Sequence, residues 1–70
     1  MNLSFITSKG NTEEYLFNFE NKKYIIKLTV HQNETFTEKI FDELGENEVT
    51  EKNKKKLISD SFYSSLLEFN

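Results

Sequence analysis

The stretch EYLFNFENKKYIIKLTVH, residues 14–31, decides the predicted fold because its side chains alternate between two faces. Such a period of two is typical of β-strands. Between its two halves, Asn21 suits a two-residue hairpin turn. The stretch therefore predicts two antiparallel strands, and one face of the pair is apolar in both: Tyr15, Phe17 and Phe19 in the first strand, and Tyr24, Ile26, Leu28 and Val30 in the second.

A third strand is predicted upstream, in the run LSFIT at residues 3–7. Leu3, Phe5 and Thr7 share one face of this run. The following SKGN contains Gly10 and Asn11, which tolerate the positive φ angles of a tight turn. The first thirty residues are thus predicted to form a three-stranded antiparallel meander.

Beyond residue 33 the period changes from two to about 3.6. TFTE resembles a capping box, in which Thr35 would begin a helix and Glu38 would bond back to it. Phe36, Ile40 and Leu44 would form the apolar stripe of that helix, and Gly45 follows it as the expected C′ residue. These signals predict a short helix over about residues 36–44.

A second helix is predicted to begin after Asn47, with Glu48 and Glu51 in its first turn. Whether one helix runs to the C-terminus or two pieces meet near Ser59 is left open. Its apolar stripe would be Ile58, Phe62, Leu66 and Phe69. The predicted fold is a single α+β domain, residues 1–70, with a three-stranded antiparallel β-meander followed by two C-terminal helices packed on one sheet face.

The composition argues against most catalytic and metal chemistry. The 70 residues include no Cys and one His, His31, so neither a disulfide nor a Cys/His zinc site can form. His31 falls on the polar face of a predicted strand, and the segment that starts at Asp42 fails the calcium-loop pattern. We expect no enzyme activity, no metal and no cofactor.

Partners and location are also constrained. All nine basic residues are Lys, and the net charge is −3, which is unusual for a sequence-specific DNA reader. The seven Phe and three Tyr form either an unusually aromatic core or part of a subunit interface, and a homodimer is one expectation for so short a chain. The chain has no long apolar run and no signal-peptide pattern at its start. We expect a cytoplasmic protein without membrane contact.

Charge is segregated along the chain. Residues 34–51 carry seven acids and only Lys39 as a base, whereas KNKKK follows at residues 52–56. On the predicted helix, carboxylates four residues apart would be about 6 Å apart along the axis, comparable to successive phosphates of a nucleic acid. This acidic block is either a site for a basic partner or the solvated side of a helix. The candidate partner-binding residues are Glu34, Glu38, Asp42, Glu43, Glu46, Glu48 and Glu51.

In its length, lack of Cys and Arg, acidic charge and α+β outline, the chain resembles small phage-encoded proteins that disable host machinery. These include anti-CRISPR proteins and the Bacillus phage DNA mimic that inhibits the histone-like protein HU. The resemblance implies a stoichiometric inhibitor, often dimeric, in the host cytoplasm. It would occupy the DNA-binding surface of a basic nucleic-acid-binding host protein, and it would not bind nucleic acid directly.

Two alternatives remain open from the sequence. One is a small nucleic-acid-binding regulator that contacts phosphates through the run Lys52–Lys56. The other is a structural subunit that associates through an exposed aromatic sheet face containing Phe17 and Phe19.

Overall fold

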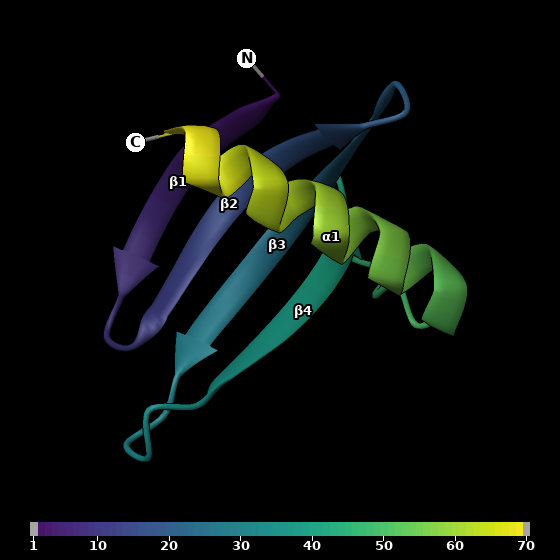
Figure 1. Cartoon of the computed structure of the whole chain (residues 1–70). Helices are drawn as coiled ribbons and strands as arrows, with labels where there is room; N and C mark the ends of the chain where they lie inside the picture. Colours follow the sequence, from purple (N-terminus) through teal and green to yellow (C-terminus); the bar gives the residue numbers. More distant parts are fainter. Residues whose placement is uncertain (1, 70) are drawn as a thin grey trace.

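The computed structural model describes residues 2–69 and has one antiparallel sheet with one helix across it (Figure 1). The strand order β1-β2-β3-β4 follows the sequence, so every connection is between neighbours. Helix α1 runs diagonally over one face of the sheet, and no helix covers the other face (Figure 1). The elements are β1 (Leu3–Lys9), β2 (Thr12–Phe19), β3 (Lys22–Val30), β4 (Phe36–Asp42) and α1 (Lys52–Phe69).

The three predicted N-terminal strands and their turns are confirmed. Gly10 has a φ of 57° between β1 and β2. Between β2 and β3, Glu20 and Asn21 have φ angles of 50° and 65°. Positive φ at both central residues defines a type I′ turn, whose twist matches that of the flanking strands. The domain is α+β as predicted, but the predicted three strands and two helices are wrong, because the sheet has four strands and the described chain has one helix.

The helix predicted over residues 36–44 is wrong, because residues 36–42 form strand β4. In its antiparallel pairing with β3, Ile40 lies opposite Ile26. Of the predicted helical stripe only Ile40 is buried, whereas Phe36 is 57% exposed and Leu44 is 76% exposed. The β-branched and aromatic residues of this segment favour strands. Pairing with β4 also gives hydrogen-bond partners to the N–H and C=O groups on the edge of β3 that faces away from β2. A helix over residues 36–44 would leave these groups without partners.

The local signals of that predicted helix belong to turns. Thr35 does not cap a helix, since its hydroxyl donates to the Asn33 side-chain oxygen at 2.6 Å in the loop before β4. Gly45 has a φ of 74°. Its amide donates to the Asp42 carbonyl at 2.9 Å, so it forms the turn after β4 rather than a helix end.

The C-terminal region is one helix, not two, and it begins later than predicted. Glu51 precedes its first residue and caps it: the carboxylate accepts the backbone N–H groups of Asn53 at 3.1 Å and Lys54 at 2.7 Å. Glu48 is not in the first turn, because it forms a β-bridge with Phe41. The side chain of Phe69 lies outside the described part of the chain.

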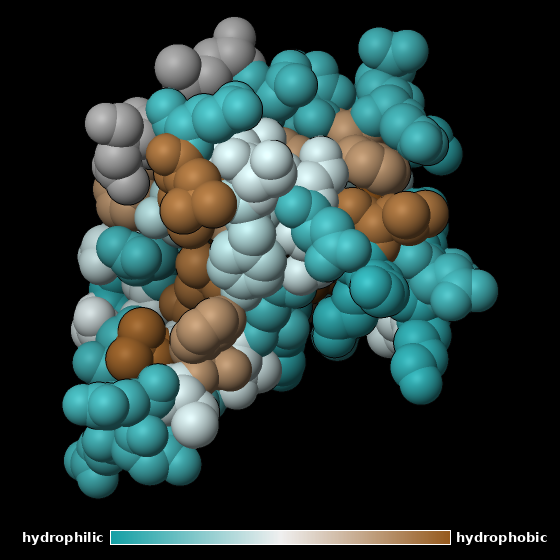
Figure 2. All heavy atoms as spheres, in the orientation of Figure 1, coloured by the Kyte–Doolittle hydropathy of each residue, from teal (hydrophilic) through white to brown (hydrophobic). Residues whose placement is uncertain are grey.

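The core lies between α1 and the sheet. Phe17, which the sequence placed on an exposed aromatic face in one alternative, is 1% exposed and belongs to this core, and Phe19 packs against it. That alternative therefore loses its proposed surface. On the helix side, apolar residues reach the surface only in separate patches among hydrophilic ones (Figure 2). The buried residues are Leu3, Tyr15, Phe17, Tyr24, Ile26, Ile40, Ile58 and Phe62.

Over residues 2–69, the structure has no helix that is both long and apolar enough to cross a membrane.

Candidate functional site

Five of the seven predicted site residues gather where the segment 43–51 connects β4 to α1. Four of them line one cleft, together with Asn47. Glu46 joins them because its amide donates to an Asp42 carboxylate oxygen at 2.9 Å. We call this group the acidic corner: Asp42, Glu43, Glu46, Glu48 and Glu51.

Asp42 holds the acidic corner together. One of its carboxylate oxygens accepts the Glu46 amide, and the other accepts the Asn47 side-chain amide at 2.8 Å. The bond from Asn47, followed by the one from Glu46, lowers the pKa of Asp42 below its ordinary value. A charged Asp42 is therefore part of the folded segment, since hydrogen bonds to a carboxylate favour its ionised form.

The backbone of the segment is tied to the sheet. The Asp42 amide donates to the Asn47 carbonyl at 2.9 Å, and the Val49 amide donates to the Ile40 carbonyl at 2.7 Å. The side chain of Val49 packs against the core. These contacts cover the edge of β4 near its C-terminal end. They give the acidic corner a defined backbone shape, which a free loop would lack.

Only part of this acidity is used within the fold. Asp42 and Glu51 each accept two hydrogen bonds, whereas the carboxylates of Glu43, Glu46 and Glu48 make no hydrogen bond or ion pair to any residue in the range 2–69. All three of these residues are exposed. The fold thus presents three uncommitted negative charges from one segment whose backbone is hydrogen-bonded to β4.

A cleft of about 690 Å³ lies beside these charges. Tyr24 and Val49 contribute apolar surface to it, and carboxylates of the acidic corner line it as well. The Lys54 amine lies 5.6 Å from the centre of the Tyr24 ring, a cation–π geometry. Three basic residues, Lys22, Lys23 and Lys54, also line the cleft. They are distant in sequence from the acids, and the pairing of β3 with β4, in which Tyr24 lies opposite Asp42, and the start of α1 bring them there.

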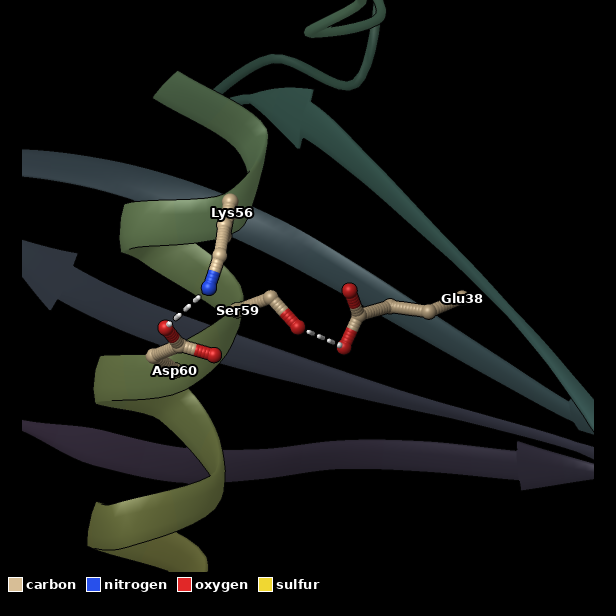
Figure 3. Close-up of polar contacts among 4 residues, drawn as sticks. All are labelled: Glu38, Lys56, Ser59 and Asp60. Carbon is tan, nitrogen blue, oxygen red and sulfur yellow. Dashed lines mark hydrogen bonds and ion pairs between the residues drawn. The ribbon is translucent and has the colours of Figure 1, made fainter. Parts of the chain in front are cut away.

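The other two predicted site residues lie elsewhere. Glu34 is in the loop between β3 and β4, at the opposite end of β4 from the acidic corner. Glu38 lies on the helix-facing side of β4, where its carboxylate accepts a hydrogen bond from the Ser59 hydroxyl at 3.1 Å (Figure 3). It joins β4 to α1 and is not available as part of the acidic corner.

Glu38 also lies where its charge acts on the ionisation of Tyr63. Burial raises the pKa of Tyr63, and the negative charge of Glu38 raises it further. An unfolded tyrosine ionises near pH 10, so the folded chain resists an ionisation that the unfolded chain allows. This contribution to stability is complete below about pH 10 and is lost as the pH rises further.

We expect Tyr63→Phe to flatten the alkaline decline in the free energy of unfolding. The measurement is urea unfolding of both proteins in steps from about pH 8 to about pH 11. Glu38→Gln is the matched variant: it removes the charge but leaves the burial, so its decline should be intermediate. Equal declines for wild type and Tyr63→Phe would contradict the assignment.

The basic run Lys52–Lys56 forms the first turns of α1. Lys56 makes an ion pair with Asp60 at 3.5 Å on the same helix (Figure 3). Lys54 contacts Tyr24, as described above. Because Glu51 already binds the helix N-terminus, the N–H groups that would favour a phosphate there are occupied.

His31 contacts Thr37, with its Nε2 atom 2.6 Å from the threonine hydroxyl oxygen, in an exposed position. Within residues 2–69 no group of three or more His, Asp or Glu side chains is arranged to hold a metal ion.

Comparisons of the chain with protein-family models, with curated proteins and with solved structures found no match.

Proposed function

We propose that this chain is a non-catalytic binding protein that inhibits a basic nucleic-acid-binding protein by occupying its nucleic-acid surface with the acidic corner. The observation that carries the proposal is the set of three exposed carboxylates, Glu43, Glu46 and Glu48, which have no partner within residues 2–69. Charges of one sign that the fold does not neutralise attract a partner of opposite sign and orient its approach.

The hydrogen bonds that fix the backbone of the segment support the same function. Binding by a mobile loop requires ordering that loop, which weakens the complex. Here the hydrogen bonds to the Asp42 carboxylate and the Val49–Ile40 backbone hydrogen bond fix the backbone that carries these carboxylates. Residues 36–42 form a strand, so the row of carboxylates expected on a helix there is absent. The acidic surface that we propose as the binding site is the acidic corner.

The cleft offers a place for the uncharged part of such a partner. Lys and Arg side chains carry apolar stems, which pack along apolar surface while the charged end stays polar. Tyr24 and Val49 provide apolar surface next to the carboxylates. A basic side chain can therefore place its stem against Val49 and its charge beside Glu48.

The test is a capture experiment with a matched pair of variants. Glu43→Gln/Glu46→Gln/Glu48→Gln removes the uncommitted charges of the acidic corner. Glu13→Gln/Glu34→Gln/Glu68→Gln changes the net charge by the same amount at exposed residues outside it. Each protein is immobilised and exposed to nuclease-treated lysate of a low-GC Gram-positive bacterium across a salt series, and captured proteins are then assayed for displacement of labelled duplex DNA.

We expect wild type and the control variant to retain the same basic DNA-binding protein and to displace its DNA. The affinity of the corner variant for this protein should be at least about tenfold lower than that of wild type. Rising salt should weaken binding by wild type and by both variants. Equal losses in both variants would show that net charge acts rather than the acidic corner. Retention of DNA that nuclease removes would instead favour the regulator that uses Lys52–Lys56.

A further inference from the structure

The outer edge of β4 is covered near its C-terminal end and open near its N-terminal end. The Ile40 carbonyl is directed outward, because it accepts the Val49 amide from the segment that follows β4. Successive residues of a paired strand direct their backbone groups to opposite edges, and β4 pairs with β3 in one unbroken register. The N–H and C=O groups of Phe36 and Glu38 therefore point outward as well. Within residues 2–69 no hydrogen bond reaches them, so this part of the edge is free to pair with another strand.

The two edges of the sheet differ in how well they can accept a strand. The pairing of β1 with β2 shifts register between Phe5 and Thr7, a bulge of the kind that disfavours pairing at an edge. The register of β4 contains no such shift, and α1 crosses only its C-terminal half (Figure 1). Lys39 is a charged edge residue of the kind that prevents indiscriminate pairing. It therefore selects which strands can join this edge.

Lys39 selects an acidic neighbour. It lies opposite Lys27, and Lys27 has Glu14 on its other side. Lys39 makes no ion pair with any residue in the range 2–69. On an added strand, the residue opposite Lys39 would form a non-hydrogen-bonded pair with it, in which side chains come closest. Opposite charges at such a position are favourable and like charges are unfavourable, so Asp or Glu fits there.

The other face of the open edge selects an apolar neighbour. Phe36 lies opposite Val30, and the two side chains are 57% and 53% exposed. The centre of the Phe36 ring lies 6.1 Å from that of Tyr63 on α1. An apolar residue opposite Phe36 on an added strand would extend this row and cover exposed aromatic surface.

We propose that the open edge of β4 binds an extended segment of another protein, which joins the sheet antiparallel to β4. The chain's own bridge between Phe41 and Glu48 has this direction, and the added strand would continue along the same line. Its residue opposite Lys39 is Asp or Glu, and the residue three positions later, opposite Phe36, is apolar. In strand addition the backbone provides affinity and alternate side chains provide specificity. This site is separate from the acidic corner and does not depend on the proposed function.

A second copy of this chain does not supply the required acid. When two β4 edges pair antiparallel, outward-directed residues of one copy pair with outward-directed residues of the other. The residue opposite Lys39 is then Thr35 or Thr37, and neither carries a charge. The partner that fits this edge is therefore a different protein.

The experiment uses the peptide acetyl-Thr-Glu-Thr-Val-Phe-Thr-amide, whose Glu would lie opposite Lys39 and whose Phe would lie opposite Phe36. It is titrated into the ¹⁵N-labelled protein to about 5 mM, and NMR spectra and amide hydrogen exchange follow the β4 amides. A second peptide has Lys in place of Glu. Two further peptides are N-methylated. Methylation of the Thr that follows Glu removes an N–H directed at Glu38, whereas methylation of Val removes one directed at solvent.

We expect the Glu peptide to shift the Phe36 and Glu38 amide signals and to slow exchange of these amides. Methylation of the Thr should abolish binding, and methylation of Val should leave it unchanged. Lys39→Glu should weaken binding of the Glu peptide about fivefold or more and should favour the Lys peptide. The control Lys9→Glu, an exposed residue on β1, should bind as wild type does.

Three results would overturn the proposal. One is that no peptide shifts these amides. Another is that both methylated peptides bind equally well, since the backbone would then not pair with β4. The third is that the same amides shift with protein concentration alone, which would show that a second copy occupies the edge.

Discussion

Phe62→Ala is expected to unfold most of the protein at room temperature. Phe62 is fully buried on α1, and its ring centre lies 5.4 Å from that of Tyr15 and 5.7 Å from that of Phe17. Removing a buried Phe typically costs about 3–5 kcal/mol. A single core of this size rarely supplies more than about 3–5 kcal/mol of net stability, so this one substitution removes nearly all of it.

The measurement is urea unfolding followed by far-UV circular dichroism, at the same protein concentration for every variant. Leu67→Ala is the matched control on the same helix, since Leu67 is 84% exposed. We expect it to change the free energy of unfolding by less than about 0.5 kcal/mol. A small loss for Phe62→Ala would contradict the position of α1 on the sheet.

Ile40→Ala is expected to have the second largest effect and to test β4 directly. Ile40 is fully buried and lies opposite Ile26 in the pairing of β3 with β4. Truncation of a buried Ile to Ala costs about 2–5 kcal/mol. Leu44→Ala should change the free energy of unfolding by less than about 0.5 kcal/mol, because Leu44 lies after the strand and is mostly exposed.

The pair of variants separates the two structures that the sequence allows for this segment. An amphipathic helix over residues 36–44 would bury Ile40 and Leu44 on the same stripe, so both substitutions would be costly. In the strand only Ile40 faces the core. Urea unfolding of the two variants under identical conditions distinguishes these outcomes, and similar losses for both would contradict the strand.

The acidic corner was only partly predictable. The sequence identified the acidic block, but it grouped Glu34 and Glu38 with the rest because all seven acids would lie on one helix and its flanks. Strand β4 separates Glu34 from the acidic corner, and the strand period turns Glu38 toward Ser59. The lysines of the cleft come from distant parts of the chain, and no local pattern indicated that they meet the acids.

The sequence alone determined those elements whose local pattern fits only one type of secondary structure. The alternation in residues 14–31 and the turn at Asn21 specify a hairpin, and the spacing of Ile58 and Phe62 specifies a helix with one buried face. Only the tertiary structure decided residues 36–42. Phe36 and Ile40 are four residues apart, a spacing that suits one helix face and equally one strand face. The unpaired edge of β3 selects the strand, because its backbone groups and the apolar side chain of Ile26 need a neighbour there.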